Sequence, residues 1–104
     1  MDIEIDELIV EEDRPSHIAK HNVTVNEVAE VVKGDYVYIR RKHTRWVLIG
    51  LTKKGKMLTI VIGARKKKNT YGLITARPAH RKERHFYYEL KQTQGGEDNE
   101  NNED

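Results

Sequence analysis

Residues 73–84 read LITARPAHRKER, and this stretch decides the fold, because an apolar run that favours a β-strand leads directly into a predicted helix. Pro78 has the fixed backbone angle that suits the first turn of a helix, so we expect a helix that starts near Pro78 and runs to about Thr93. The junction carries guanidinium, imidazole and carboxylate side chains, which are groups that bind phosphate or transfer protons. The stretch therefore predicts a functional site where the strand meets the helix.

Four β-rich runs separated by short charged connections predict an antiparallel meander. These runs cover residues 36–41, 45–51, 57–62 and 71–76. Ahead of them, residues 3–12 are rich in Ile, Leu and Val and favour a first strand. The expected class is α+β, with an antiparallel sheet of about four to five strands and helices that cover one face of it.

Two short helices are expected between the first strand and the meander. Asp13 can cap the first helix, and Asn22 can end it, because asparagine tolerates the left-handed backbone conformation. Thr24 followed by Glu27 predicts a capping box for the second helix, and Gly34 stops that helix. The expected order is one strand, two helices, four strands and one helix.

Charge is distributed very unevenly along the 104 residues. Positions 40–91 hold 16 Lys and Arg against 2 Asp and Glu, positions 1–39 hold 3 against 10, and positions 92–104 hold 0 against 5. Such a basic body is typical of proteins that bind nucleic acid. We expect one domain over residues 1–93. Residues 94–104 are predicted to be a disordered acidic tail, which either keeps the protein soluble or folds back on the basic body.

The composition excludes several classes of site. The absence of cysteine removes disulfides, thiolate zinc sites and a cysteine nucleophile. His17 and His21 are four residues apart, but no HExxH pattern completes a zinc site, so neither a metal nor a cofactor is expected. No run approaches the roughly 20 apolar residues that cross a bilayer, and the acidic N-terminus is unlike a signal peptide. The prediction is a soluble cytoplasmic protein without a membrane partner.

The last predicted helix combines an apolar stripe with a charged border. A rotation of about 100° per residue places Ala79, Phe86 and Leu90 in the stripe that should face the sheet. Glu83 falls at the edge of this stripe, where a carboxylate needs a partner, and Arg77 is the candidate. The next positions around the helix form a band between its buried and exposed faces, and they are His80, Arg84 and Tyr87.

Two interpretations of this pair remain open. An ion pair between Arg77 and Glu83 can simply dock the helix on the sheet, or it can belong to a site, and both can hold together. His80 also has two interpretations. It can belong to a site, or it can be an ordinary surface residue, as histidines on basic helices often are.

Basic side chains gather at strand ends and turns, with aromatic residues among them. Lys and Arg neutralise phosphates, and exposed aromatics stack on unpaired bases. Trp46 can also be a core residue because it begins an apolar run, and the lysines at 66–68 can form a solvated hairpin loop. The side chains expected to contact RNA are Lys20, Arg45, Trp46, Lys66, Lys67, Lys68, His80 and Arg81.

Four segments resemble the BrnT family, which comprises ribonuclease toxins of bacterial type II toxin–antitoxin systems. One of them is the apolar run at 58–65, which is similar to a family strand that ends in Arg. KHNV at 20–23 is similar to the KHGV of the family, and RWVLIG at 45–50 is similar to its RWxxIG strand. The most specific likeness is ITARPAHRKERHFY at 74–87, which resembles ISARxAxxxERxxY with Thr75 in place of Ser. His80 stands where the family has a small hydroxyl residue, so it inherits no family role.

The resemblance implies a RelE-like fold and a metal-independent endoribonuclease that inhibits translation and growth. It also implies a cognate antitoxin, either BrnA-like or another small DNA-binding protein, which would cover the basic surface and alone contact promoter DNA. The residue types fit attack of a ribose 2′-hydroxyl on the adjacent phosphorus, which needs a base, an acid and cationic stabilisation. The candidates are Arg65, Arg77 and Arg84 for stabilisation, Glu83 or His21 for the base, and Tyr87 or His21 for the acid.

Two other functions are compatible with the same residues. A non-catalytic RNA- or DNA-binding module would use the basic sheet and leave the Arg77 and Glu83 pair purely structural. An interaction domain would meet its partner through the acidic tail instead. Salt-sensitive binding without cleavage would favour the binding module.

Overall fold

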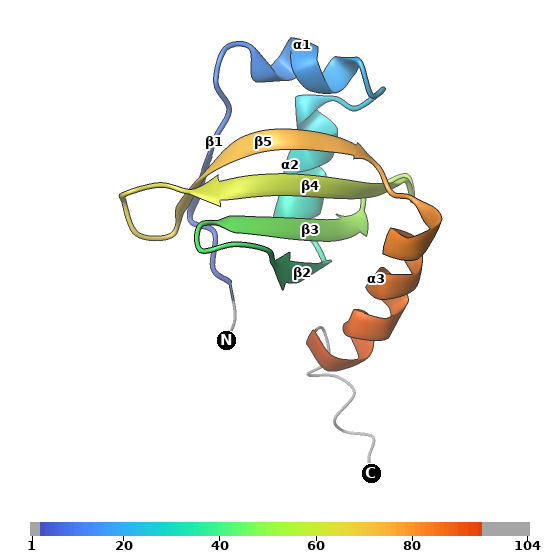
Figure 1. The fold of residues 1–104 in the computed structure, drawn as a ribbon. Coiled ribbons are helices and arrows are strands. Elements are labelled where there is room, and N and C mark those ends of the chain that lie inside the picture. The colour runs from blue at the N-terminus through green and yellow to red at the C-terminus, as the bar shows by residue number, and fades with distance from the viewer. Residues whose placement is uncertain (1–2, 95–104) are drawn as a thin grey trace.

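A five-stranded sheet forms the centre of the molecule in the computed structural model, which describes residues 3–94 (Figure 1). The elements in chain order are β1 (Glu7–Ile9), α1 (Arg14–Ala19), α2 (Val25–Lys33), β2 (Tyr36–Arg40), β3 (Arg45–Leu51), β4 (Met57–Ala64), β5 (Thr70–Pro78) and α3 (Arg81–Gln94). The strand order is β1-β5-β4-β3-β2, with β1 parallel to β5 and the other pairs antiparallel. The predicted class, element order and meander are therefore confirmed.

The local signals for the second helix act as predicted. The Thr24 hydroxyl accepts a hydrogen bond from the Glu27 backbone N–H at 3.1 Å, and the Glu27 carboxylate accepts one from the Thr24 backbone N–H at 3.0 Å. Gly34 follows the last turn of α2, and Asn22 has a φ of 68° after α1. The capping box and the left-handed asparagine thus set the short connection between the two helices.

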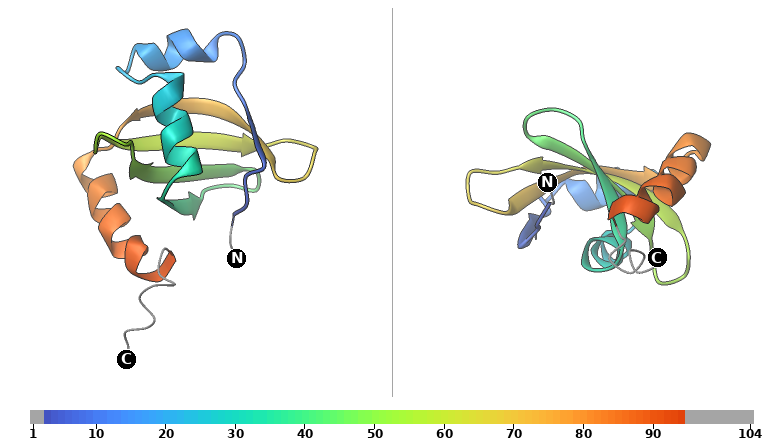
Figure 2. Two further views of the ribbon diagram at one scale, coloured as in Figure 1. Left: turned by 180° about the vertical axis from the view of Figure 1, so that it is seen from behind. Right: turned by 90° about the horizontal axis from the view of Figure 1, so that it is seen from below.

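Helices lie on both faces of the sheet, so the expectation of a single covered face was wrong. On one face, Leu48, Ile60 and Ile62 pack with Ile18 and Val28 from the α1 and α2 region. Figure 2 shows α2 running across this face. On the opposite face, a second apolar cluster includes Val37, Val47, Ile49, Met57 and, from α3, Tyr87. The physical reason is that the central strands carry apolar side chains at consecutive positions, so both of their faces need cover.

The last helix starts at Arg81, which corrects the predicted start near Pro78. Pro78 ends β5 opposite Leu58, and the Ala79 backbone N–H donates to the Met57 carbonyl at 2.9 Å. A strand end suits proline because no ladder N–H is needed there. The helix runs through Gln94, the first residue of the predicted tail, and the rest of that tail lies outside the described residues.

This later start changes which side chains of α3 face the sheet. Tyr87 is 4% exposed and packs on the sheet with Leu90, whereas Phe86 is 43% exposed. Phe86 was therefore wrongly assigned to the buried stripe. The predicted stripe assumed 100° of rotation per residue from Ala79, which precedes the helix. The stripe was therefore placed at the wrong angle around the helix axis. None of the helices in residues 3–94 combines the length and apolar character needed to span a bilayer.

We expect Tyr87→Ala to lower the free energy of unfolding by about 3 kcal/mol, because it empties a buried aromatic position between α3 and the sheet. The adjacent exposed residue is a matched control, and Phe86→Ala should change the same quantity by no more than about 1 kcal/mol. Urea denaturation followed by circular dichroism measures both. A larger loss for Phe86→Ala would contradict the observed orientation of α3.

Candidate functional site

An irregularity in β5 decides which side chains reach the face of the sheet that α3 occupies. Thr75 pairs with Val61 and Leu73 with Ile62, so Ile74 is an extra residue in β5. Before this bulge, Leu73 points into the core beneath α1 and α2. Because a strand alternates its side chains, the extra residue turns Thr75 and then Arg77 to the opposite face. Without it, both polar side chains would point into the apolar core.

Arg77 is held by a bidentate ion pair with Glu83. Its Nη1 and Nη2 donate to the two carboxylate oxygens at 2.8 and 2.7 Å. Oε1 of Glu83 also accepts from the Thr59 hydroxyl at 2.9 Å and from the His80 backbone N–H at 2.7 Å. The pair that the sequence predicted is thus present, and it joins β5, β4 and the start of α3.

The electrostatics of this network fix the charge of Glu83. Hydrogen bonds from Arg77 are the largest cause that lowers the pKa of Glu83 to about 2, and they outweigh desolvation, which raises it. The His80 backbone N–H and the Thr59 hydroxyl add to the lowering. The carboxylate is therefore ionised throughout the neutral range, and it accepts from four donors, three on Oε1 and one on Oε2.

The histidines of the α1 region lie beside the same stretch of β5. His17 Nε2 is 3.1 Å from the Thr75 hydroxyl oxygen, and the His17 and His21 rings meet edge to face with centroids 5.7 Å apart. Arg14 donates through Nη1 to the carbonyl of Ile74, the extra residue of the bulge. The α1 region is thus bound to the bulge, and this places the His17 imidazole at Thr75 with the His21 ring beside it. Figure 1 shows α1 beside β5.

His17 is the residue near this face that sequence reasoning did not select. It was considered only as one half of a zinc site. The four-residue spacing of His17 and His21 indicates that the two side chains are neighbours. The contact between His17 and Thr75 spans 58 positions, so no local sequence pattern predicts it. Among residues 3–94, no group of three or more side chains has the composition of a metal site.

Arg65 and the lysines of the β4–β5 loop lie at the far end of the hairpin from Arg77. Arg65 is six positions from Thr59, the β4 partner of Arg77, and this separation corresponds to about 20 Å along a strand. The Arg65 guanidinium lies over Gly72 and pairs with Glu11 at 3.3 Å. The structure does not bring Arg65 together with Arg77. The exposed loop lysines are Lys66, Lys67 and Lys68, and Lys67 pairs with Glu7 at 3.7 Å.

The remaining predicted residues are spread over three places. Tyr87 is buried against the sheet, and desolvation is the largest cause that raises its pKa. Trp46 lies on the α2 face, where its ring packs on Tyr38 with centroids 6.0 Å apart, which agrees with the core interpretation. The other predicted side chains are exposed, and they are Lys20, His21 and Arg45, with His80, Arg81 and Arg84 at the start of α3.

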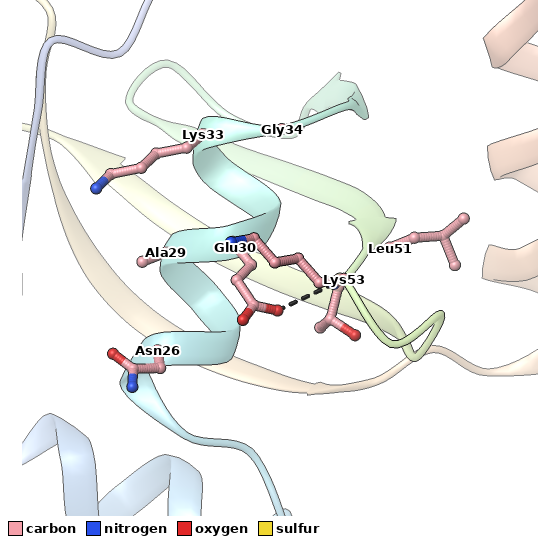
Figure 3. Close-up of a pocket in the computed structure, with 8 residues that line it drawn as sticks. Asn26, Ala29, Glu30, Lys33, Gly34, Leu51 and Lys53 are labelled. Carbon is pink, nitrogen blue, oxygen red and sulfur yellow. Dashed lines mark hydrogen bonds between the residues drawn. The ribbon is translucent and has the colours of Figure 1, made fainter.

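A hollow beside α2 does not contribute to this network. It has a volume of about 510 Å³ and lies between α2 and the β3–β4 turn, where the Lys53 backbone N–H donates to Glu30 at 3.0 Å (Figure 3). It shares no residue with the Arg77 and Glu83 network or with the histidine pair. Glu30 is the one carboxylate among its lining residues, so the hollow holds no pair of carboxylates.

His17, His21 and Arg77 are of the residue types that bind phosphate or transfer protons. The chain matches the family described as the ribonuclease toxin BrnT of type II toxin–antitoxin systems over residues 11–83. Its structure is similar to a 1.1 Å crystal structure of the Brucella abortus ribonuclease toxin BrnT, with a TM-score of 0.57 and 18% sequence identity, over 72% of this chain and 97% of that chain. No curated protein matches by sequence.

Because the family match covers more than half of the chain, this protein belongs to the BrnT family of ribonuclease toxins. It is the toxin of a type II toxin–antitoxin system, which implies a cognate antitoxin as its partner. Family membership favours the enzyme over the non-catalytic binding module and the interaction domain. The family match ends at residue 83, so Arg84 and Tyr87 lie beyond it.

The lowered pKa of Glu83 predicts a specific pH dependence of stability. Because the folded-state pKa lies below the ordinary value of 4.5, the stabilisation is complete above about pH 5 and is lost as the pH falls toward 2. This shift corresponds to at most about 3 kcal/mol. Urea denaturation across this range should show that the free energy of unfolding falls more steeply for the parent protein than for Glu83→Gln.

An exposed carboxylate on the same helix provides the control. Glu89 lies two turns further along α3 with its side chain 60% exposed, and Glu89→Gln should follow the parent curve. Parallel curves for the parent and Glu83→Gln would show that the Arg77 ion pair does not hold the charge of Glu83.

Proposed function

We propose that this toxin cleaves single-stranded RNA without a metal ion on the face of the sheet that carries Arg77. The observation that carries the proposal is that β5 holds an oriented guanidinium at Arg77 and, two residues earlier, a hydroxyl in contact with His17, whose ring lies beside that of His21. Thr75 and Arg77 are two residues apart on the same face, and His17 contacts Thr75. These residue types supply cationic stabilisation and proton transfer, which are the requirements of phosphodiester cleavage through the ribose 2′-hydroxyl.

In the proposed reaction, the 2′-oxygen attacks the adjacent phosphorus while one histidine of the pair takes the hydroxyl proton. The bond from phosphorus to the 5′-oxygen breaks, and the second histidine gives a proton to that leaving oxygen. The products are a 2′,3′-cyclic phosphate and a 5′-hydroxyl. His21 is the exposed member of the pair, and His17 is the member held against Thr75.

Arg77 stabilises the negative charge that develops on the phosphoryl oxygens. Glu83 accepts from one Nη1 donor and one Nη2 donor, and the Pro78 carbonyl accepts from Nη1 at 3.4 Å. A guanidinium has five N–H donors, so others remain for a phosphate. The low pKa of Glu83 and its four hydrogen-bond donors support a role in orienting Arg77 in preference to the predicted role of base. The burial and raised pKa of Tyr87 likewise argue against an acid role.

The antitoxin is the second part of the proposal. A BrnA-like or other small DNA-binding antitoxin would cover the basic sheet face with an acidic or extended segment and would alone contact promoter DNA. The excess of cations over residues 40–91 supports this complementarity. We place the pair in the cytoplasm, where its RNA substrate is found.

Arg77→Lys should lower the rate of RNA cleavage by about 100-fold or more, because lysine keeps the charge but loses the planar fork that Glu83 orients. The assay follows labelled single-stranded RNA in excess EDTA, with folding checked by thermal unfolding. Lys33→Ala, an exposed cation at the end of α2, is the control and should cleave at the parent rate. Retained cleavage by Arg77→Lys, or loss of parent activity in EDTA, would exclude this mechanism.

The histidine pair predicts a separate loss of activity. His17→Gln and His21→Gln should each slow cleavage by about 100-fold, because each removes a group that transfers a proton. His85→Gln changes an exposed imidazole that pairs with Glu89 on α3, and its rate should stay close to that of the parent. Single-turnover rates measured across pH give the comparison. Unchanged rates and pH profiles for both variants of the pair would assign proton transfer to other groups.

A further inference from the structure

A second hollow lies on the face of the sheet that carries Arg77, next to the loop between β2 and β3. It has a volume of about 290 Å³, and its lining residues are Arg41, Lys42, Arg45, Val47 and Val61. Val47 and Val61 belong to the sheet and form an apolar floor, and the three cations surround it. This volume is close to the lower end of the roughly 300–1,000 Å³ typical of ligand sites.

The three cations of the hollow are among the basic residues that have no acidic partner in the described part of the chain. Within the described residues 3–94, no acidic side chain forms an ion pair with Arg41, Lys42 or Arg45. Elsewhere, acidic side chains pair with Arg14, Lys56, Arg65, Lys67, Arg77 and Lys91. Three like charges around one hollow repel one another, and a bound anion removes that repulsion.

Hydrogen bonds hold the loop in the shape that forms the hollow. The Arg41 backbone N–H donates to the Arg45 carbonyl at 3.0 Å, and the Ala64 backbone N–H donates to the Thr44 carbonyl at 2.7 Å. Arg40 points to the other side, where its guanidinium lies 5.5 Å from the centre of the Trp46 ring. The hollow is therefore preformed, which lowers the entropy cost of binding.

A row of paired residues leads from this hollow to the histidine pair. Val47 pairs with Val61, and Val61 pairs with Thr75, which contacts His17. Neighbouring strands are about 4.8 Å apart, so Val61 is one strand from Thr75 and about 8 Å from Arg77. A short piece of single-stranded RNA can thus occupy the hollow and place an adjacent phosphate at Arg77.

We propose that this hollow binds a nucleotide that flanks the cleaved phosphate, with its phosphate on Arg41, Lys42 and Arg45 and its base or ribose on Val47 and Val61. The inference rests on the proposed function, because it assigns the substrate subsite of the same face. An acidic peptide would satisfy the cations equally well. RNA is favoured because the row of paired residues that starts at Val47 ends at Thr75 and His17, which belong to the proposed cleavage site.

The test uses binding to a short 2′-O-methyl single-stranded RNA, which lacks the attacking hydroxyl, so binding is separated from cleavage. The double variant Arg41→Gln/Arg45→Gln should bind more than 10-fold more weakly at low salt. It should also reduce the slope of log K against log salt concentration by about 1.4, because each lost contact with single-stranded nucleic acid contributes about 0.7. Fluorescence anisotropy over a salt series measures both quantities.

The control removes the same charge from elsewhere. Lys33→Gln/Lys54→Gln changes exposed lysines at the end of α2 and in the β3–β4 turn, and it should keep the parent slope to within about 0.3. With cleavable RNA, the hollow variant should raise KM at least 10-fold and change kcat less than 3-fold. This split distinguishes a binding subsite from the catalytic groups.

Equal slopes for the hollow and control variants would overturn the subsite. Parent-like RNA binding by the hollow variant with weaker binding of the antitoxin would also overturn it and assign the hollow to the antitoxin. The proposed function fails on different evidence, namely retained cleavage by Arg77→Lys. If the hollow variant loses RNA binding but the parent protein cleaves no RNA, the hollow is an RNA-binding site and the proposed cleavage reaction is rejected.

Discussion

The ion pair between Arg77 and Glu83 is the interaction on which the rest of the site depends. It connects the end of β5 to the start of α3, and through the Thr59 hydroxyl it also reaches β4. Removing one partner would leave the other charge half-buried without compensation, which is strongly destabilising. The same contact docks the helix and fixes the plane of the guanidinium, and in the proposed reaction it would orient Arg77 toward RNA. The two interpretations that the sequence left open are thus compatible.

The bulge at Ile74 gives this ion pair its position. It reverses the alternation of β5, so that Leu73 faces the core and Thr75 and Arg77 face the other side. Arg14 satisfies the carbonyl of Ile74, and this contact anchors the α1 region with its histidines. A backbone irregularity and two helices thereby assemble groups that lie far apart in the sequence. The cationic hollow lies on the same face of the sheet, and in the proposal it would bind the nucleotide next to the cleaved phosphate.

The sequence was most informative where the interactions are local. The capping box at Thr24, the left-handed Asn22 and the third strand from 45 to 51 follow from neighbouring residues, and all are confirmed. The partner of Glu83 was also predictable, because a carboxylate at the edge of an apolar stripe needs a cation. The bulge, the contact of His17 with Thr75 and the orientation of α3 depend on long-range packing. A one-residue irregularity in a strand has no signature in composition or periodicity.

The nature of the RNA ends is the measurement that tests the central claim most directly. The parent protein is incubated with a defined single-stranded RNA in EDTA, and the product masses are determined. Cleavage through the 2′-hydroxyl, with Arg77 and the histidine pair as the acting groups, predicts 2′,3′-cyclic phosphate and 5′-hydroxyl ends. Products with 3′-hydroxyl and 5′-phosphate ends would contradict the account, because they require attack by water from the opposite side of the phosphate.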